Sequence, residues 1–149
     1  MPILLCLFII LLGASPIVAQ SIVITEIHHS PMDGNSRLEF IELHNRSKGV
    51  VSLSSWQVTK GIQYTFPKGT VLEGGAYLVL AKDAEYLKKH YELKANELVL
   101  GSFKGRLDGE GECLVLKDAR GKEVDRVNYK NKKTWAYCKG EIRASLQLI

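Results

Sequence analysis

The stretch L-E-F-I-E-L-H at residues 38–44 decides the fold class of this chain. Within it the apolar residues Ile41 and Leu43 alternate with the polar residues Glu42 and His44. Successive side chains of a strand point to opposite faces, so this alternation places the apolar residues on one face and the polar residues on the other. The stretch therefore predicts a half-buried β-strand.

Segments of the same kind lie on both sides of this stretch. The run I-V-I-T-E-I at residues 22–27 is rich in β-branched residues, which suit a pleated, half-buried surface. Turn signals rich in Gly, Pro, Asn and Ser separate the later segments. We expect further strands at residues 50–53, 56–59, 62–66, 71–72, 77–80, 97–100, 114–117, 123–129 and 144–149. Many short strands without alternating helices predict an all-β sandwich or barrel.

One short helix and two turns interrupt this pattern. Asp83 is a suitable N-cap for a helix over residues 84–91. Residues 66–69 (F-P-K-G) match a type I turn, with Pro at its second position and Gly at its fourth. Gly121 supplies the positive φ that a hairpin connection over residues 118–121 requires.

The N-terminus has the composition of a secretory signal peptide. Residues 1–19 contain no charged side chain, and residues 3–12 form an unbroken apolar run. This run is shorter than the roughly 20 apolar residues that a membrane span needs. We therefore expect export, cleavage after Ala19 and one domain over residues 20–149. The absence of Lys and Arg before the run, and Ile17 at the −3 position, keep a retained anchor as the alternative.

Two of the three cysteines belong to the expected domain. Cys6 would leave with the signal peptide, whereas Cys113 and Cys138 would remain in an oxidising compartment, where thiols tend to pair. A Cys113–Cys138 disulfide is therefore favoured. Two independent thiols or a metal site are the alternatives.

Histidines and carboxylates at predicted strand ends are the candidates for chemistry. His28, His29 and His44 could approach Glu26 and Glu42 if the first two strands pair, and acid–base catalysis or metal binding would use such groups. Adjacent histidines on a strand point to opposite faces, so at most one of the first two could join His44. The chain has no H-E-x-x-H, G-x-S-x-G, P-loop or G-x-G-x-x-G motif. We expect no catalytic residue, no metal and no cofactor.

Lysines and aromatic residues gather in a predicted loop at residues 130–139. Cations contact phosphates and rings stack on bases, so an anionic ligand such as nucleic acid is one interpretation. No base-reading motif accompanies the cluster, which favours a solvated loop in which Trp135 covers the end of the core. The candidate anionic-ligand loop consists of Lys130, Lys132, Lys133, Trp135, Tyr137 and Lys139.

The net charge and a glycosylation sequon add little to the functional interpretation. The net charge of +4 belongs to the expected domain, because residues 1–19 carry no charged side chain. Such a modest positive balance favours anionic partners only where the charges cluster. Residues 45–47 (N-R-S) form a glycosylation sequon, which has meaning only in a eukaryotic source.

Five stretches taken together resemble the lamin tail domain, an immunoglobulin-like β-sandwich. They are I-T-E-I-H-H-S-P (24–31), L-E-F-I-E-L-H-N (38–45), V-S-L-S-S-W-Q-V (51–58), Y-T-F-P-K-G-T-V-L-E-G-G-A-Y-L-V-L (64–80) and G-R-L-D-G-E-G-E-C-L-V-L-K-D-A-R-G-K-E-V-D-R-V-N-Y (105–129). Their order and spacing extend over nearly the whole expected domain. The end departs from the family pattern, because Ala136 follows Trp135 where the family typically has Pro.

The resemblance implies a non-catalytic role. Tail domains of nuclear lamins resemble interaction modules for proteins and DNA, whereas bacterial relatives are often exported and joined to hydrolase or nuclease domains. The signal peptide and the absence of coiled-coil heptads favour the second group. We expect an exported binding or scaffolding module, at the cell envelope or outside the cell, with a protein or glycan partner.

Three alternatives stay open beside this expectation. The first is an exported nucleic-acid-binding accessory that uses the loop at residues 130–139. The second is part of a secreted hydrolase or nuclease that uses His28, His44 and Glu42. A direct membrane contact would require an uncleaved N-terminal segment.

Overall fold

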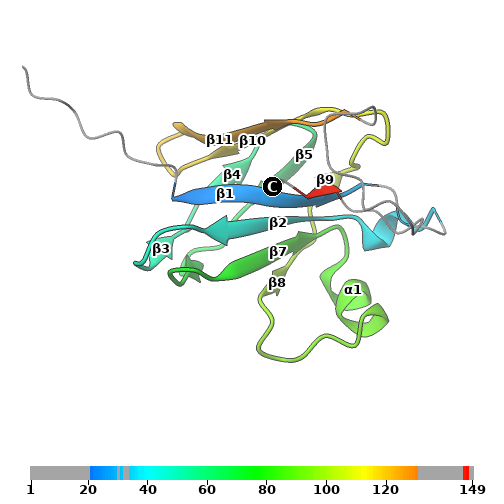
Figure 1. Cartoon of the computed structure of the whole chain (residues 1–149), viewed down its shortest axis with the longest axis horizontal. Helices are drawn as coiled ribbons and strands as arrows, with labels where there is room; N and C mark the ends of the chain where they lie inside the picture. The colour runs from blue at the N-terminus through cyan, green and yellow to red at the C-terminus, as the bar shows by residue number, and fades with distance from the viewer. Residues whose placement is uncertain (1–20, 30, 32–33, 131–145, 148–149) are drawn as a thin grey trace, which may run out of the picture.

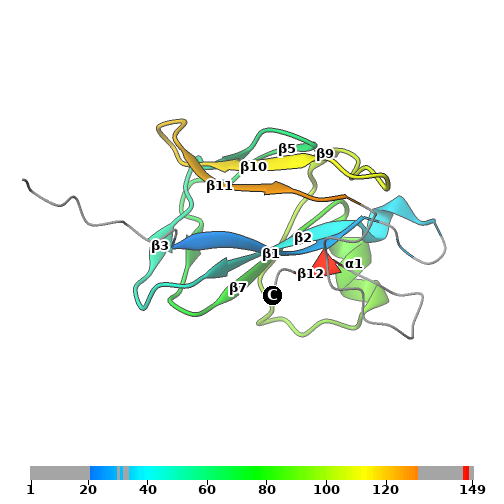
Figure 2. The ribbon, with the colours of Figure 1, turned by 45° about the horizontal axis from the view of Figure 1, so that its top comes forward.

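Two five-stranded sheets pack face to face in the computed structural model, which describes residues 21–29, 31, 34–130 and 146–147. The strand order is β12-β1-β2-β7-β8 in the first sheet and β11-β10-β4-β5-β9 in the second. Figure 1 shows the arrangement, and Figure 2 shows the two layers, with β10 and β11 above β1, β2 and β7. The predicted all-β, immunoglobulin-like sandwich with one short helix is confirmed.

The elements are short, as the spacing of the turn signals predicts. The first sheet contains β1 (Ile22–His28), β2 (Phe40–Asn45), β7 (Tyr77–Ala81), β8 (Val99–Leu100) and β12 (Leu146–Gln147). The second contains β4 (Gln57–Val58), β5 (Ile62–Thr65), β9 (Lys104–Gly105), β10 (Cys113–Lys117) and β11 (Glu123–Asn128). A separate ribbon pairs β3 (Val51–Ser52) with β6 (Val71–Leu72). The helices are the 3-10 turn η1 (Ser36–Leu38) and α1 (Ala84–His90).

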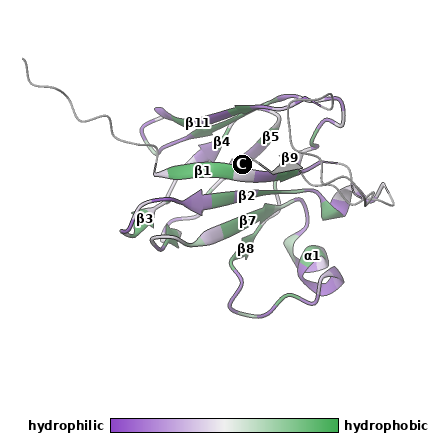
Figure 3. Cartoon of the chain, in the orientation of Figure 1, coloured by the Kyte–Doolittle hydropathy of each residue, from purple (hydrophilic) through white to green (hydrophobic). Residues whose placement is uncertain are grey.

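The core lies between the two sheets and follows the alternation in the sequence. On β2, Ile41 and Leu43 are fully buried, while Glu42 and His44 lie half-buried on the outer face. Figure 3 shows apolar residues along β1 and β7, the strands on either side of β2. The second sheet contributes apolar residues such as Leu114 to the same cluster. Period-2 alternation therefore builds this core from both sides.

Helix α1 covers part of the outer face of the first sheet. Leu87 packs there with Ala81 and Val99, which form a second, smaller cluster. The predicted N-cap is confirmed, because Asp83 Oδ1 accepts a hydrogen bond from the N–H of Tyr86 at 3.0 Å. In the part of the chain that the structure describes, no helix has the length and hydrophobicity to span a membrane.

Three local predictions need correction. The segment expected to begin the second strand instead forms η1, and β2 starts at Phe40. The loop after β8 contains the unpredicted strand β9, which pairs with β5. The turn near Pro67 is shifted by one residue, since the N–H of Thr70 donates to the carbonyl of Pro67 at 3.2 Å. Gly69 then takes the third position with φ +82°, a conformation that glycine adopts readily.

The hairpin between β10 and β11 matches its prediction. Gly121 has φ +80°, and its N–H donates to the carbonyl of Asp118 at 3.0 Å. The Asp118 carboxylate also accepts the N–H groups of Arg120 and Lys122, each at 2.9 Å. Turn chemistry written into four consecutive residues therefore forms this connection.

Asp125 of β11 ties the two sheets together. Its Oδ2 accepts the N–H of Ile24 on β1 at 2.7 Å, although the two residues are 101 positions apart. Ile24 adjoins a β-bulge, where the register between β1 and β2 shifts before Glu26. Burial raises the pKa of the Asp125 carboxyl. A buried carboxylate therefore satisfies a main-chain donor of the opposite sheet.

Candidate functional site

The strand-end histidines do not converge. His28 stacks on Phe40 with ring centroids 5.0 Å apart, and His44 stacks on Tyr77 at 4.2 Å. In the β1–β2 register His28 lies opposite Phe40 and His44 opposite Val23, so the two rings lie near opposite ends of the strand pair. The approach of either His28 or His29 to His44, considered from the sequence, does not occur. Among the described residues, no group of three His, Cys, Asp or Glu side chains could hold a metal ion.

His29 belongs to the contact between the two sheets. Its ring stacks on Tyr129, which follows β11, at a centroid distance of 5.4 Å. The hydroxyl of Tyr129 lies 2.9 Å from the carbonyl oxygen of Asp108 and 3.0 Å from the Glu112 carboxylate, and these two acceptors share its one proton. Ring stacking and hydrogen bonds therefore connect the residues that follow β1 and β11 to the loop before β10.

Acid should weaken the fold through these buried rings. Burial lowers the pKa of both His28 and His29, so each is neutral near pH 7. A histidine with a lowered folded-state pKa contributes stability above the unfolded pKa of about 6.5, and that stability is lost as the pH falls through the folded value. We expect wild-type protein to lose more unfolding free energy between pH 7.5 and pH 5.0 than His28→Phe, which keeps a ring against Phe40. Urea unfolding at the two pH values measures this.

An exposed histidine provides the control for this experiment. His90 lies at the surface of α1, so His90→Gln should show the wild-type pH dependence. An identical loss of stability in His28→Phe and wild type would contradict the assignment of this acid sensitivity to His28.

The two carboxylates considered from the sequence lie side by side, and Glu42 has a hydrogen-bond partner. Glu26 and Glu42 lie opposite each other across β1 and β2, and Thr25 Oγ1 donates to Glu42 Oε1 at 2.7 Å. Burial raises the pKa of Glu42, and the charge of Glu26 raises it further. Glu39 is fully buried and accepts the main-chain N–H of Leu107 at 3.0 Å.

The folded protein makes the asparagine of the glycosylation sequon inaccessible. Asn45 is fully buried, and its Nδ2 donates to the carbonyls of Gly49 at 2.8 Å and Leu72 at 2.9 Å. Its Oδ1 accepts the N–H of Ser47 at 3.0 Å and the Ser47 hydroxyl at 2.7 Å. The nitrogen to which a glycan would be attached is thus engaged inside the protein, and the folded domain leaves no room for one.

Several predicted features lie wholly or partly outside the described residues. They include the signal peptide at residues 1–19 and all of the basic loop except Lys130, which is exposed directly after buried Tyr129. Cys113 is half-buried at the start of β10, where its Sγ accepts a hydrogen bond from Arg126 Nη1 at 3.2 Å. Its proposed partner Cys138 is not described, so the disulfide stays a prediction. The remaining loop candidates outside the described residues are Lys132, Lys133, Trp135, Tyr137 and Lys139.

A surface groove between η1 and α1 is the candidate site that the sequence did not reveal. Its volume is about 610 Å³, and its lining residues are Arg37, Glu85, Tyr86, Lys89 and His90. This volume is within the range of about 300–1,000 Å³ that ligand pockets commonly have.

The capping residues of the two helices build this groove. Asn35 caps η1 by accepting the N–H of Arg37 at 3.2 Å, and it also donates from Nδ2 to the Tyr86 hydroxyl at 2.9 Å. Asp83 caps α1, and its Oδ2 also accepts a hydrogen bond from Arg37 Nε at 2.9 Å and lies 2.9 Å from Arg37 Nη2 in an ion pair. The hydrogen bond from the Tyr86 N–H, and after it the one from Arg37, hold the pKa of Asp83 below its usual value. Each cap therefore also holds a side chain of the other helix.

Arg37 lies flat on the aromatic wall of the groove. Its guanidinium carbon is 3.8 Å from the centroid of the Tyr86 ring, a cation–π contact. Lys89 and His90 follow Tyr86 by three and four positions, so the three side chains share one face of α1. Arg37 and Asp83 are 46 residues apart, and nothing in the sequence connected them. The groove can therefore present fixed cationic donors beside an aromatic ring.

Comparison with protein families agrees with the architecture. The Lamin Tail Domain matches residues 16–131, well over half of the 149 residues. The match ends just after β11, ahead of the region where the sequence departs from the family pattern. A search of curated proteins found no match. The sandwich and this match together show that the chain belongs to the lamin tail domain family.

Proposed function

We propose that this chain is an exported, non-catalytic binding or scaffolding module that holds a protein or glycan partner at the cell envelope or outside the cell. The uncharged, apolar N-terminal segment supports export. Membership of the lamin tail domain family supports an interaction role, which is an argument by analogy. The observation that carries the proposal is the fixed position of Arg37 in the groove between η1 and α1.

Arg37 is ordered before any partner arrives. The Asp83 carboxylate holds one edge of its guanidinium, and the ring of Tyr86 supports its plane. Ordering a long side chain on binding commonly costs about 0.5–1.5 kcal/mol of binding free energy. A side chain that folding has already fixed does not lose this free energy when the partner binds. Sites held by scaffold elements in this way are suited to binding a partner in one orientation.

Binding to isolated cell envelopes tests this proposal. We expect fluorescently labelled protein, purified after export, to bind envelopes of its source organism saturably. Arg37→Glu reverses the charge at the groove and should weaken this binding at least about tenfold, the effect of roughly 1.4 kcal/mol. Pretreating the envelopes with protease or with periodate then distinguishes a protein partner from a glycan.

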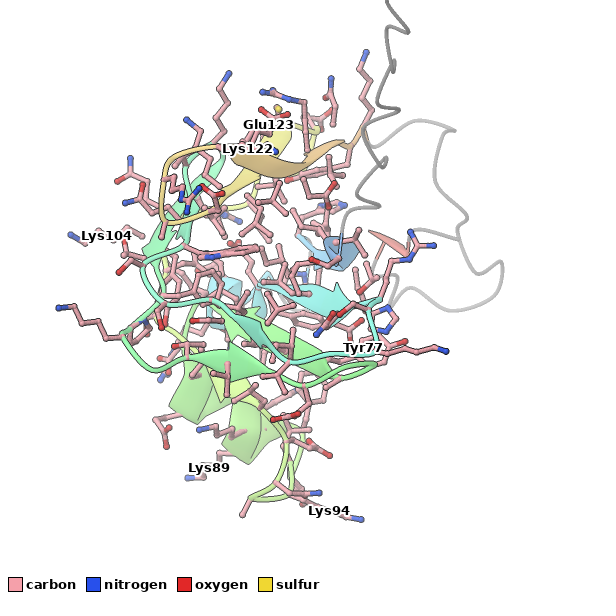
Figure 4. The ribbon with its side chains drawn as sticks, turned by 90° about the vertical axis from the view of Figure 1, so that its left-hand side faces the viewer. Tyr77, Lys89, Lys94, Lys104, Lys122 and Glu123 are labelled. Atoms are coloured by element: carbon pink, nitrogen blue, oxygen red, sulfur yellow. The ribbon has the colours of Figure 1, made fainter. Side chains whose placement is uncertain are left out.

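Lys122 provides the matched control. It is exposed in the hairpin between β10 and β11, and Figure 4 shows it at the opposite end of the molecule from Lys89 of α1. Lys122→Glu changes the net charge by the same amount and should leave the binding unchanged. Non-saturable binding, or equal losses in the two variants, would contradict a partner site at the groove.

A nucleic-acid-binding accessory is the second candidate function. The observation that favours it is Lys130, which is exposed where β11 leads into the basic segment of residues 130–139. If this function holds, replacing Lys130, Lys132 and Lys133 with Ala weakens DNA binding at low salt and reduces its salt dependence. A triple variant that binds DNA as tightly as wild type would exclude this function. For a hydrolase we make no proposal, because His28 and His44 lie apart.

A further inference from the structure

We propose that the groove between η1 and α1 binds a carboxylate side chain of an acidic protein segment. This inference rests on the proposed binding function and names the chemistry of its ligand. It follows from the open edge of Arg37, the charges that line the groove and an exposed aromatic residue beside it.

Arg37 has one guanidinium edge engaged and one edge free. Asp83 Oδ2 accepts a hydrogen bond from Nε and forms an ion pair with Nη2, while Nη1 makes no hydrogen bond to any of the described residues. The side chain remains 55 % exposed, so its outer edge faces solvent. A guanidinium edge presents parallel N–H donors whose spacing matches the two oxygens of a carboxylate. Tyr86 fixes the plane in which such a carboxylate would lie.

The charges around this edge favour an anion. Lys89 and His90 line the groove one helical turn beyond Tyr86. Glu85 also lines it, but its carboxylate pairs with Lys88 at 3.2 Å. Asp83 is likewise paired with Arg37, so the Lys89 ammonium is the lining cation without an opposing carboxylate among the described ion pairs. An acidic ligand therefore meets complementary charge.

An exposed aromatic residue beside the groove favours a protein segment over an isolated anion. Tyr91 directly follows α1, is 46 % exposed, and meets the His90 ring edge-on at a centroid distance of 4.8 Å. Tyrosine is enriched at protein interfaces, where its ring covers an apolar side chain and its hydroxyl stays wet. A segment that carries both an acidic and an apolar residue would offer a partner to Arg37 and a partner to Tyr91.

Titration with short peptides tests the ligand chemistry directly. We expect an N-acetylated, C-amidated tetraglutamate peptide to shift amide NMR signals of the protein around Arg37 and along α1, and a tetraglutamine peptide to leave them unchanged. Lys89→Gln removes one lining cation without touching the Asn35–Tyr86 and Arg37–Asp83 contacts, and it should weaken the peptide about fivefold. Lys122→Gln should bind like wild type. The affinity should also fall as salt is added.

Each contrary outcome overturns a defined part of the inference. Equal shifts with tetraglutamine, no binding of tetraglutamate, or equal affinities of the two lysine variants would reject a carboxylate site. A uronic-acid disaccharide that binds as tightly as tetraglutamate would reject a protein segment as the ligand. If Arg37→Glu lowers envelope binding while tetraglutamate does not bind, the proposed function stands and only this inference fails.

Discussion

Replacing Asn45 with Asp is expected to lower the free energy of unfolding by about 3–5 kcal/mol, as when a buried charge loses its partners. The substitution keeps the shape of the side chain but exchanges its two N–H donors for a carboxylate oxygen. That oxygen would face the carbonyls of Gly49 and Leu72, which now accept hydrogen bonds at 2.8 Å and 2.9 Å. Because the site is fully buried, water cannot solvate the new charge. Urea denaturation monitored by tryptophan fluorescence measures the loss.

An exposed asparagine separates this effect from the chemistry of the substitution itself. Asn96 lies at the surface of the loop between α1 and β8, so Asn96→Asp should change stability by less than about 0.5 kcal/mol. A loss below about 1 kcal/mol in Asn45→Asp would mean that the connection between β2 and β3 rearranges at little cost.

Replacing Glu39 with Ala is expected to cost about 3 kcal/mol, the upper end of the range of about 1–3 kcal/mol for leaving a buried hydrogen-bond donor unsatisfied. Glu39 is fully buried just before β2, and its Oε2 accepts the N–H of Leu107 at 3.0 Å. Without the carboxylate, that main-chain donor is left without its partner inside the protein. The change in the urea midpoint, at an unchanged dependence on denaturant concentration, measures the cost.

Arg106 provides the matched comparison for Glu39. Its Nε lies 3.1 Å from Glu39 Oε1, but the Arg106 side chain is 70 % exposed. Water screens this contact, so Arg106→Ala should cost less than about 1 kcal/mol. Equal losses in Glu39→Ala and Arg106→Ala would show that the ion pair, rather than the bond to Leu107, stabilises this loop.

The same buried carboxyl should respond to pH. Burial raises the pKa of Glu39, against the opposing effects of its bonds to Leu107 and Arg106. A raised folded-state pKa favours the protonated form, so its contribution to stability is present below the unfolded pKa of about 4.3 and is lost as the pH rises through the folded value. This dependence is opposite in sign to that of His28 and His29. The two effects act around different unfolded pKa values, so the variants at these positions can separate them.

Local sequence predicted the elements of this fold well. The alternation around Ile41 and Leu43 predicted a buried face, and both residues are fully buried. Asp83 predicted the start of α1, and Gly121 predicted the hairpin between β10 and β11. These features depend on side-chain direction and turn conformation within a few residues, which the chain specifies by itself.

Pairing between distant strands escaped prediction, and so did one short strand that depends on it. Strand β9 contains only Lys104 and Gly105, and it is a strand because β5 pairs with it. Strand β8 was predicted within residues 97–100, but its parallel pairing with β7, with Val99 opposite Val79, was not. Two residues are too few for a periodic signal, so pairing across the sheet decides their conformation.

The sequence did not predict the candidate groove, for a related reason. Neither Arg37 nor Asp83 belongs to a motif; Asp83 was recognised only as a helix cap, and the helical turn η1 that carries Arg37 was not predicted. The histidines that did attract a functional interpretation, His28 and His44, instead stack on separate aromatic residues. Sequence reasoning identifies chemistry-bearing residues, but their convergence depends on strand register and on how α1 docks.

By itself, the sequence determined the all-β class, the approximate strands, the cap of α1 and the family resemblance that the match over residues 16–131 bears out. Only the tertiary structure decided that Asp125 bonds to Ile24 101 residues away, that Glu39 bonds to Leu107 68 residues away, and that Arg37 lies on Tyr86. The physical reason is the range of the interactions. Periodicity and capping act within one or two turns of chain, whereas a buried carboxylate or a fixed guanidinium finds its partner only once the packed sheets and α1 bring distant residues together.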